Sequence, residues 1–259
     1  MESGIVTEVR DRIGYVTIDR QERRNALSQE TMEALVEVFD RYDRDDDVWV
    51  VAITGAGDKA FSAGRDLKQL ADRDSAGAGA HLPMKGMTRN VFEAIYECGK
   101  PTVAVINGWA MGGGLEVALA CDLRIAVQSA SMGLPESKRG MGANFGAAIL
   151  PRIVPAGVAT EMLYLGESIT AQDALAVGLV NRVFPAETFR EDAEAYVREL
   201  LRRAPLTVRR YKQVLQRTLE MPLSAAIRVP LRYDPYSSED RVEGVRAFVE
   251  KREPEWRAR

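Results

Sequence analysis

Short apolar runs and helical patterns alternate along about the first 185 residues of the chain. Residues 5–9 and 15–18 alternate apolar and polar side chains, which predicts an antiparallel strand pair that turns near 11–14. The run 48–53 is continuously apolar, as is typical of a strand covered on both faces. Further strands are predicted at 102–106, 123–127 and 180–184. Strands that alternate with helices in this way predict an α/β fold.

Between the strands, apolar residues recur at helical spacing. Ser28 can cap a helix that runs to about Tyr42. The other helices predicted in this part are 84–98, 115–120, 144–150, 156–165, 174–177 and 188–203. Thr188 stands three residues before Glu191, which is the spacing of a capping box. Beyond Pro205 we expect only helix, with one apolar stripe through positions 208, 211, 214, 215, 218 and 219.

These patterns divide the chain into an α/β core over residues 1–200 and a helical region over 201–259. The 259 residues are 46% hydrophobic and 28% charged, which is ordinary for a globular protein with a sizeable core. The formal net charge of -3 argues against nucleic acid or an anionic membrane as the main partner. No apolar run is long enough to span a membrane, and the first residues lack the pattern of a secretory signal. We therefore expect a cytoplasmic protein.

Cysteine and histidine usage narrows the chemistry. The two cysteines, Cys98 and Cys121, lie in apolar contexts and are expected to be reduced core residues. The sequence has neither a CxxC pair nor a Cys/His cluster, so we expect no metal site. The single histidine, His81, lies in the glycine- and alanine-rich stretch 74–83, and no GxSxG motif accompanies it. A histidine-based nucleophile is therefore disfavoured, and carboxylates become the leading acid/base candidates.

The most informative stretch is 106–122, where a predicted strand leads into the consecutive glycines Gly112 to Gly114. A strand, a glycine turn and a helix start offer free backbone N–H groups to an anion. Glu116 lies on the first turn of the helix that follows, and its apolar neighbours argue against a solvated position. Taken alone, three glycines are equally consistent with a tight turn.

Six motifs, in order, carry a resemblance to a known family. They are RNAL at 24–27, FSAGRDL at 61–67, NGWAMGGGLE at 107–116, LPE at 134–136, TAQDALAVGLVN at 170–181 and EGVRAFVEKR at 243–252. The chain resembles the enoyl-CoA hydratase/isomerase (crotonase) superfamily along nearly its whole length. The resemblance implies a crotonase-like spiral core of repeated ββα units and a C-terminal helical trimerisation region. It also implies homotrimers, or hexamers built as dimers of trimers.

The same resemblance implies the chemistry. Family members stabilise a thioester enolate with two backbone N–H groups, and the matching positions here are Arg65 and Gly113. Hydratases of the family use two glutamates on one water, and these match Glu116 and Glu136. The implied role of Glu116 is to activate the water that adds at C3, while Glu136 holds that water and delivers a proton to C2. The implied function is that of an enoyl-CoA hydratase, which acts on an acyl-CoA thioester without a cofactor.

Further positions match residues that bind coenzyme A in the family. On one subunit they are Arg24, Ala26, Ala63, Leu67 and Lys68. The adenine is expected against the backbone near Ala63, Arg65 and Leu67, and the nearby Arg24 and Lys68 are the candidates for the phosphates of CoA. Phe248 and Lys251 match positions that reach the nucleotide of a neighbouring subunit. Each of these charged side chains could equally be a solvated surface residue.

Two stretches depart from the family pattern. Arg65 places a large cation where smaller residues are common, so its side chain is expected to point toward a CoA phosphate or solvent. The segment 140–146 is one residue short and contributes to the acyl site, which leaves the identity of the acyl group open. The tail from 238 to 256 resembles that of carnitinyl-CoA dehydratases, which favours a polar or branched acyl group. Asp66 is expected to order its loop, and Asp122 to be a structural acid.

Several functions therefore compete. The first is an enoyl-CoA hydratase, or a carnitinyl-CoA-type dehydratase that runs the same chemistry in reverse. An enoyl-CoA isomerase typically keeps only the carboxylate that matches Glu136, so the presence of Glu116 favours hydration. A non-catalytic or RNA-binding member of the fold is disfavoured by the net charge of -3 and by both glutamates. A serine peptidase on a related fold lacks a suitably placed histidine.

Overall fold

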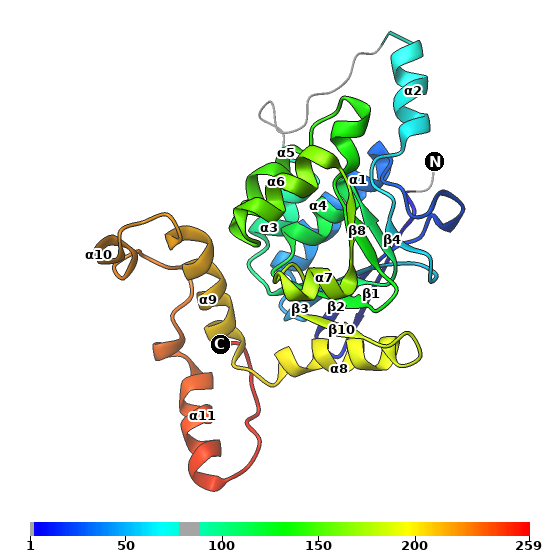
Figure 1. Cartoon of the computed structure of the whole chain (residues 1–259). Helices are drawn as coiled ribbons and strands as arrows, with labels where there is room; N and C mark the ends of the chain where they lie inside the picture. The colour runs from blue at the N-terminus through cyan, green and yellow to red at the C-terminus, as the bar shows by residue number, and fades with distance from the viewer. Residues whose placement is uncertain (1–2, 78–88) are drawn as a thin grey trace.

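The strands of the chain form two sheets. The computed structural model describes residues 3–77 and 89–259 (Figure 1). The six-stranded sheet has the order β1-β2-β3-β5-β7-β10, with the bounds Ile5–Arg10, Ile13–Ile18, Val50–Gly55, Thr102–Ile106, Leu123–Val127 and Arg182–Phe184. The four-stranded sheet has the order β4-β6-β8-β9, with the bounds Ala60–Ser62, Trp109–Met111, Ser131–Gly133 and Ser168–Thr170. Only β1 with β2 and β8 with β9 pair antiparallel among the named strands, and all other neighbours are parallel.

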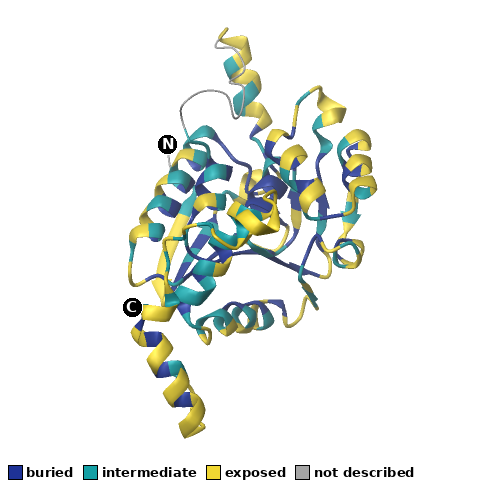
Figure 2. Cartoon of the chain, turned by 90° about the vertical axis from the view of Figure 1, so that its left-hand side faces the viewer, coloured by how far each residue is buried: buried dark blue, intermediate teal, exposed yellow. Residues whose placement is uncertain are grey.

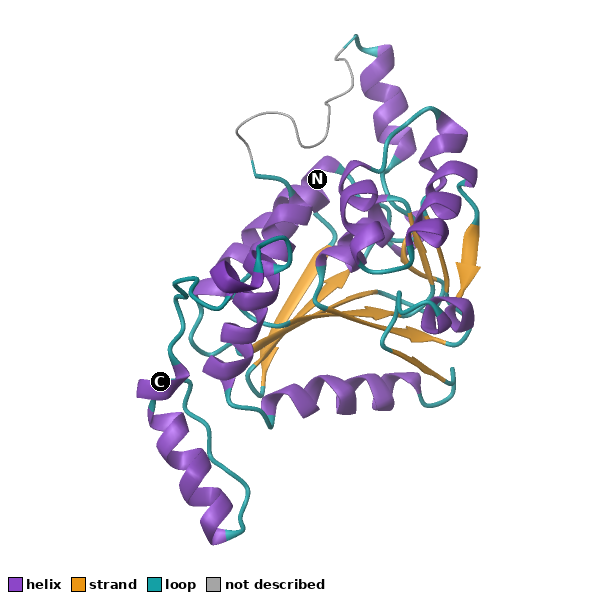
Figure 3. Ribbon diagram, turned by 60° about the vertical axis from the view of Figure 1, so that its left-hand side comes forward, coloured by secondary structure: helices purple, strands orange, loops and turns teal. Residues whose placement is uncertain are grey.

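Helices fill the connections between the strands. From the N-terminus the α-helices α1 to α11 are Gln29–Arg44, Leu67–Ser75, Val91–Glu97, Gly113–Ala120, Asn144–Ile149, Ala156–Leu165, Ala171–Ala176, Phe189–Leu201, Pro205–Thr218, Leu223–Ala226 and Glu239–Glu250. Short 3-10 helices, η1 to η4, lie at Gln21–Arg23, Pro135–Arg139, Leu150–Arg152 and Pro235–Ser237. Helix α8 contacts β3 and β10 and lies on one side of the six-stranded sheet, whereas most other helices of the core lie on the opposite side (Figure 3).

A repeating path of the chain connects the two sheets. In the pairs β3/β4, β5/β6 and β7/β8, the first strand joins the six-stranded sheet and the second joins the four-stranded sheet. Helical residues follow each pair before the next pair begins. This is the spiral of ββα units that the family resemblance implies, so that prediction is confirmed. The repeat is structural, and no corresponding sequence repeat accompanies it.

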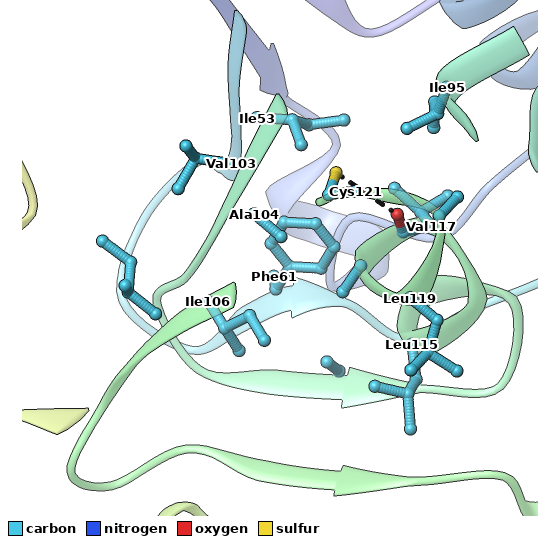
Figure 4. Packing of buried hydrophobic residues seen from close by; sticks show 14 of the residues in the cluster. Ile53, Phe61, Ile95, Val103, Ala104, Ile106, Leu115, Val117, Leu119 and Cys121 are labelled. Carbon is cyan, nitrogen blue, oxygen red and sulfur yellow. Dashed lines mark hydrogen bonds between the residues drawn. The ribbon is translucent and has the colours of Figure 1, made fainter. Parts of the chain in front are cut away.

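The core lies between the sheets and the helices that cover them. Every residue of α4 from 114 to 120 is buried, and its apolar side chains pack against strands β4 and β5 (Figures 2 and 4). Phe61 of β4 and Leu115 of α4 are fully buried at this junction. Cys98 and Cys121 are buried and free, as the sequence predicts. Helix α4 is therefore fixed on all sides, which makes it a rigid support for a site at its N-terminus.

Three sequence predictions need correction. Helix α3 begins at Val91 rather than at 84, because Asn90 forms a capping box that starts the helix there, and residues 84–88 lie outside the described residues. Thr188 makes no cap hydrogen bond to the backbone, since its hydroxyl bonds to Asp192 instead. Residues after 205 are not all helical, because non-helical segments separate α9, α10 and α11.

The C-terminal arm, residues 205–259, extends from the core (Figure 1). The predicted stripe on α9 exists, but Tyr211, Leu215 and Leu219 are exposed on this chain. Polar side chains hold α9 to the core instead: Gln216 donates to the carbonyl of Tyr96, and Lys212 has a buried Nζ that lies 2.8 Å from a carboxylate oxygen of Asp122 and donates to a backbone carbonyl. Asp122 also accepts hydrogen bonds from Thr102, so it is a structural acid as predicted, although about a quarter of its side chain is exposed. In the described residues, no helix has the length and hydropathy that a membrane span requires.

Candidate active site

The carboxyl ends of three neighbouring parallel strands, β4, β6 and β8, carry the predicted site. Residues 63–66 follow β4, the glycines 112–114 follow β6, and Glu136 follows β8. Because parallel strands end at the same edge of a sheet, segments far apart in the sequence meet there. The structure therefore brings together the loop of Arg65, the start of α4 and the 3-10 helix η2.

Glycines allow two of these segments to touch. Gly64 has a φ of +84°, and a Cβ on it would lie 2.5 Å from the carbonyl oxygen of Met111 and 3.1 Å from the backbone nitrogen of Gly113. Gly112, at the N-cap of α4, has a φ of +54°. A side chain is disfavoured at both positions, on steric grounds and by the backbone conformation. Glycine is thus what allows the Arg65 loop to approach the N-terminus of α4.

Two backbone N–H groups point into this junction. Leu27 donates to Gly64 and accepts from the N–H of Asp66 in a parallel bridge, which leaves the N–H of Arg65 on the opposite side of its strand. Gly113 is the first residue of α4, where an N–H has no partner within the helix. A Cβ added to Gly113 would lie 3.7 Å from the nitrogen of Arg65. Within residues 3–77 and 89–259, neither N–H meets an acceptor of the protein.

Glu116 lies on the first turn of α4 and is 6% exposed. One carboxylate oxygen accepts a hydrogen bond of 2.8 Å from the N–H of Gly146, at the start of α5. Burial raises the pKa of Glu116 to about 7, the backbone N–H groups of Gly146 and Phe145 oppose this rise, and the charge of Glu136 adds to it. Glu116 therefore exchanges a proton near neutral pH, as a group that serves as a general base must.

Glu136, on η2, is the second carboxyl of the junction. Its Oε1 faces the backbone of Gly112, because a Cβ on that glycine would lie 2.8 Å from it. Its Oε2 is buried and has no hydrogen-bond partner among the described residues. Burial raises the pKa of Glu136, which favours the protonated form. The two carboxyl groups thus come from different elements, and the field of Glu136 reaches Glu116.

The positions expected to bind CoA divide into two groups. Those of one subunit lie around the Leu27–Arg65 bridge, where Ala26 is buried and the others are exposed: Arg24, Ala63, Leu67 and Lys68. The guanidinium of Arg24 lies 5.1 Å from the ring centroid of Trp109. Phe248 and Lys251 lie on or directly after α11, in the arm, and Phe248 is 84% exposed. The chain by itself therefore does not bring the second group to the first.

The side chain of Arg65 does not point into solvent. It is half-buried, and its Nη1 lies 3.5 Å from the sulfur of Met32 on α1, so the predicted direction toward solvent is not found, while the direction toward a CoA phosphate stays a prediction. The reason is that the long aliphatic stem of arginine packs well on apolar surface. Burial lowers the pKa of this guanidinium. Asp66 orders the loop as predicted, since it caps α2 and pairs with Arg20 at 3.1 Å.

The sequence did not identify three residues at this junction. Gly146 and Phe145 lie in the stretch 140–146, which departs from the family pattern, and Trp109 lies inside the glycine motif. The sequence contains one indication of this aromatic contact. Phe92 and Tyr96 are four residues apart and so lie on one face of α3, and both contact Phe145. In the described residues no three His, Cys, Asp or Glu side chains are grouped so as to hold a metal ion. His81 lies outside these residues. The sequence predicts a loop that begins at residue 74, but helix α2 continues to Ser75.

Comparisons with known proteins identify the family of the chain. Residues 8–259 match the family model of enoyl-CoA hydratase/isomerase. An (E)-benzylidenesuccinyl-CoA hydratase of Thauera aromatica is 38% identical over 260 residues, which cover 98% of both chains. A carnitinyl-CoA dehydratase of Citrobacter koseri is 36% identical over 252 residues, which cover 94% of both chains. The crystal structure of an enoyl-CoA hydratase from Bacillus anthracis has a TM-score of 0.88 at 31% identity and covers 99% of this chain and 100% of its own. The chain therefore belongs to the enoyl-CoA hydratase/isomerase (crotonase) family and is an enzyme of the hydratase and dehydratase type.

Proposed function

We propose that the protein catalyses the reversible addition of water across the C2=C3 bond of a 2-enoyl-CoA thioester. One observation carries this proposal. Two carboxyl groups, Glu116 and Glu136, both with raised pKa values, lie beside two backbone N–H groups that have no acceptor among the described residues. Addition of water needs a base for the water, an acid for carbon and a site for negative charge on the thioester oxygen.

The N–H groups of Arg65 and Gly113 are the proposed oxyanion donors. As hydroxide adds to C3, the electrons of the double bond move toward the carbonyl and form an enolate. Both donors are backbone groups held by a parallel bridge and by the rigid helix α4, so they need no reorganisation when this charge develops. One donor of this kind contributes about 3 kcal/mol to transition-state stabilisation. The positive end of α4 acts in the same direction.

The two glutamates divide the proton transfers. Ionised Glu116 takes a proton from the water while its oxygen bonds to C3, and the N–H of Gly146 holds one carboxylate oxygen so that the other can face the water. Protonated Glu136 then delivers a proton to C2, where the electron pair of the enolate forms the new C–H bond. A proton returns from Glu116 to Glu136 through solvent and resets the pair. Dehydration is the same sequence in reverse.

Further features support the proposed substrate and assembly. Arg24 and Lys68 are exposed cations beside the donors and are the proposed phosphate contacts, with Ala26, Ala63 and Leu67 along the same segment. Phe248 and Lys251 are proposed to reach the CoA of a neighbouring subunit, because the arm that carries them extends from the core (Figure 1). The exposed apolar residues of α9 are the proposed contact for a homotrimer, or for a dimer of trimers. The chemistry as written uses no cofactor.

A dehydratase of a polar acyl-CoA is the second candidate. It rests on the tail after Ser238, which resembles that of carnitinyl-CoA dehydratases, and on the relative of that name. The catalytic groups are the same in both candidates, so only the acyl group and the direction of flux differ. An isomerase needs one carboxylate fewer and would leave Glu116 without a role. Because Glu116 is buried, a carboxylate without a role at this position is disfavoured.

The test is to follow loss of the conjugated thioester absorbance with a short and a long trans-2-enoyl-CoA. Glu116→Gln and Glu136→Gln are expected to abolish turnover, whereas Glu161→Gln, on the exposed surface of α6, serves as the matched control and should keep it. Turnover that survives in both active-site variants would refute the assigned roles. Absence of turnover in a wild-type protein that still binds CoA thioesters would refute simple enoyl hydration, and 3-enoyl and polar hydroxyacyl thioesters would then be tried.

A further inference from the structure

Three aromatic side chains lie directly behind the anchor of Glu116. Phe145 stacks on Phe92 with ring centroids 5.4 Å apart and an interplanar angle of 22°. Tyr96 meets the same ring edge-on at 6.3 Å. Phe92 and Tyr96 are four residues apart on α3, so one face of that helix holds Phe145 from two sides. We call these three residues the aromatic clamp.

The clamp acts on the residue next to the anchor. Gly146 follows Phe145, and its N–H donates to Glu116. There is little room for this backbone to move, because a Cβ on Gly146 would lie 3.0 Å from a methyl group of Leu134 and 3.4 Å from Cγ of Glu116. Besides this contact with Leu134, the held ring of the adjacent Phe145 helps to fix where the N–H lies. Helix α5, with six residues, is too short to hold that position by its own hydrogen bonds.

Few charged side chains lie near the hydrogen bond between Gly146 and Glu116. Helices α3 and α5 and strands β4 to β6 pack against α4, and of these only α3 carries titratable side chains. Glu93 bonds to the backbone N–H that starts α3, and Glu97 pairs with an arginine. The pKa of the Tyr96 phenol is raised by burial, so this group stays neutral. When Glu136 is ionised it disfavours ionisation of Glu116, so the backbone N–H groups of Gly146 and Phe145 are the main source of stabilisation for the Glu116 carboxylate.

From this geometry we infer that Phe145 is a positioning residue, which keeps the N–H of Gly146 directed at the carboxylate of Glu116 through the aromatic clamp. The expected effect of Phe145 on catalysis rests on the proposed role of Glu116. The expected effect of Phe145 on the titration of Glu116 does not. Hydrogen bonds to a carboxylate favour its ionised form. Loosening the clamp therefore removes stabilisation from the ionised form of Glu116, while burial continues to disfavour that form.

The test uses Phe145→Leu, with Phe184→Leu as the matched control. Phe184 pairs with Tyr196 at 6.5 Å on β10 and α8, so the control removes a similar aromatic contact away from the site. The titration of Glu116 in the folded chain is read from urea unfolding, in each background, as the pH above which the stability difference between a Glu116→Gln variant and its parent stops growing. We expect Phe145→Leu to raise that pH by about one unit, to move the acidic limb of kcat/KM in parallel, and to lower kcat about tenfold at neutral pH. Phe145→Tyr, which keeps the ring, should restore the wild-type values.

The control variant should lose stability without a change in either pH value. If Phe145→Leu behaves like the control, the inference is wrong. If Phe145→Leu does not fold, Tyr96→Leu removes the edge-on contact alone, and the same shift is expected at smaller size. A wild-type protein without hydratase activity would refute the proposed function, while the unfolding measurement would still decide the role of Phe145.

Discussion

Replacing Glu116 by Gln is expected to stabilise the protein at alkaline pH. The side chain is 6% exposed, and burial raises its pKa from the ordinary 4.5 to about 7 in the folded chain. Glutamine has the shape of the protonated carboxyl and keeps an oxygen that can accept from the N–H of Gly146. The substitution therefore removes the ionisation with little change in packing.

The magnitude follows from the two pKa values. Their difference, 7 − 4.5, is 2.5 units, which corresponds to about 3 kcal/mol. Below the unfolded pKa the carboxyl is protonated in both states and contributes no difference. As pH rises toward 7 the unfolded chain loses this proton and the folded chain retains it, so wild-type stability falls, and above the folded pKa the full cost is present. The variant should thus match the wild type near pH 4 and exceed it by about 3 kcal/mol near pH 9.

Urea unfolding, followed by circular dichroism at fixed protein concentration, measures this difference across the pH range. Glu136 is present in both proteins, so its own contribution cancels to first order. Glu161→Gln, at an exposed position on α6, is the control for removal of a surface carboxyl, and the stability gain that grows with pH should be specific to Glu116→Gln. A constant difference between Glu116→Gln and wild type from acid to alkaline pH would refute the reasoning, since it would mean that Glu116 titrates alike in both states.

Two further substitutions test the surroundings of the site. Gly112→Ala would place a Cβ 2.8 Å from Oε1 of Glu136, so kcat should fall about 10²-fold in steady-state kinetics, while Gly157→Ala, which has open space around it, should leave kcat unchanged. Equal kcat values in the two variants would contradict the placement of Glu136. Lys212→Met removes the buried partner of Asp122 and should lower the free energy of unfolding by about 3 kcal/mol, measured in urea. A loss below about 1 kcal/mol would show that the pair contributes little to holding the arm on the core.

Local sequence patterns predicted the strands of the six-stranded sheet and most helices of the core, but none of the short strands of the four-stranded sheet. Helix α6 has the predicted bounds, because its apolar pattern is followed by Gly166 in the left-handed conformation, a strong stop signal. For α3 the pattern predicts a start that is too early, because apolar spacing continues upstream of the capping residue Asn90. The apolar stripe of α9 was recognised, but the pattern does not say what covers Tyr211 and Leu215. Periodicity reports an apolar face and leaves its partner undetermined.

The site was predicted from its motifs rather than from its geometry. Glu116 stood out, because a single carboxylate among apolar residues of a helix has few structural uses. Nothing local singled out Glu136, whose neighbours suggest a solvated residue after a proline, and only the family motif identified it. The contact of Gly146 with Glu116 joins positions 30 residues apart and depends on tertiary packing. Local patterns cannot place such contacts, which is why the aromatic clamp was missed.

Because of the bridge between Leu27 and Arg65, the direction of the Arg65 backbone N–H does not depend on the Arg65 side chain. The backbone hydrogen bonds of this bridge fix the direction of the N–H of Arg65, while the side chain lies elsewhere, against Met32. Any amino acid except proline supplies the same N–H, so this position can accumulate substitutions without losing the proposed donor. Related enzymes can thus diverge at position 65, and change what lies beside the substrate, in single mutational steps that leave the proposed catalytic donor in place.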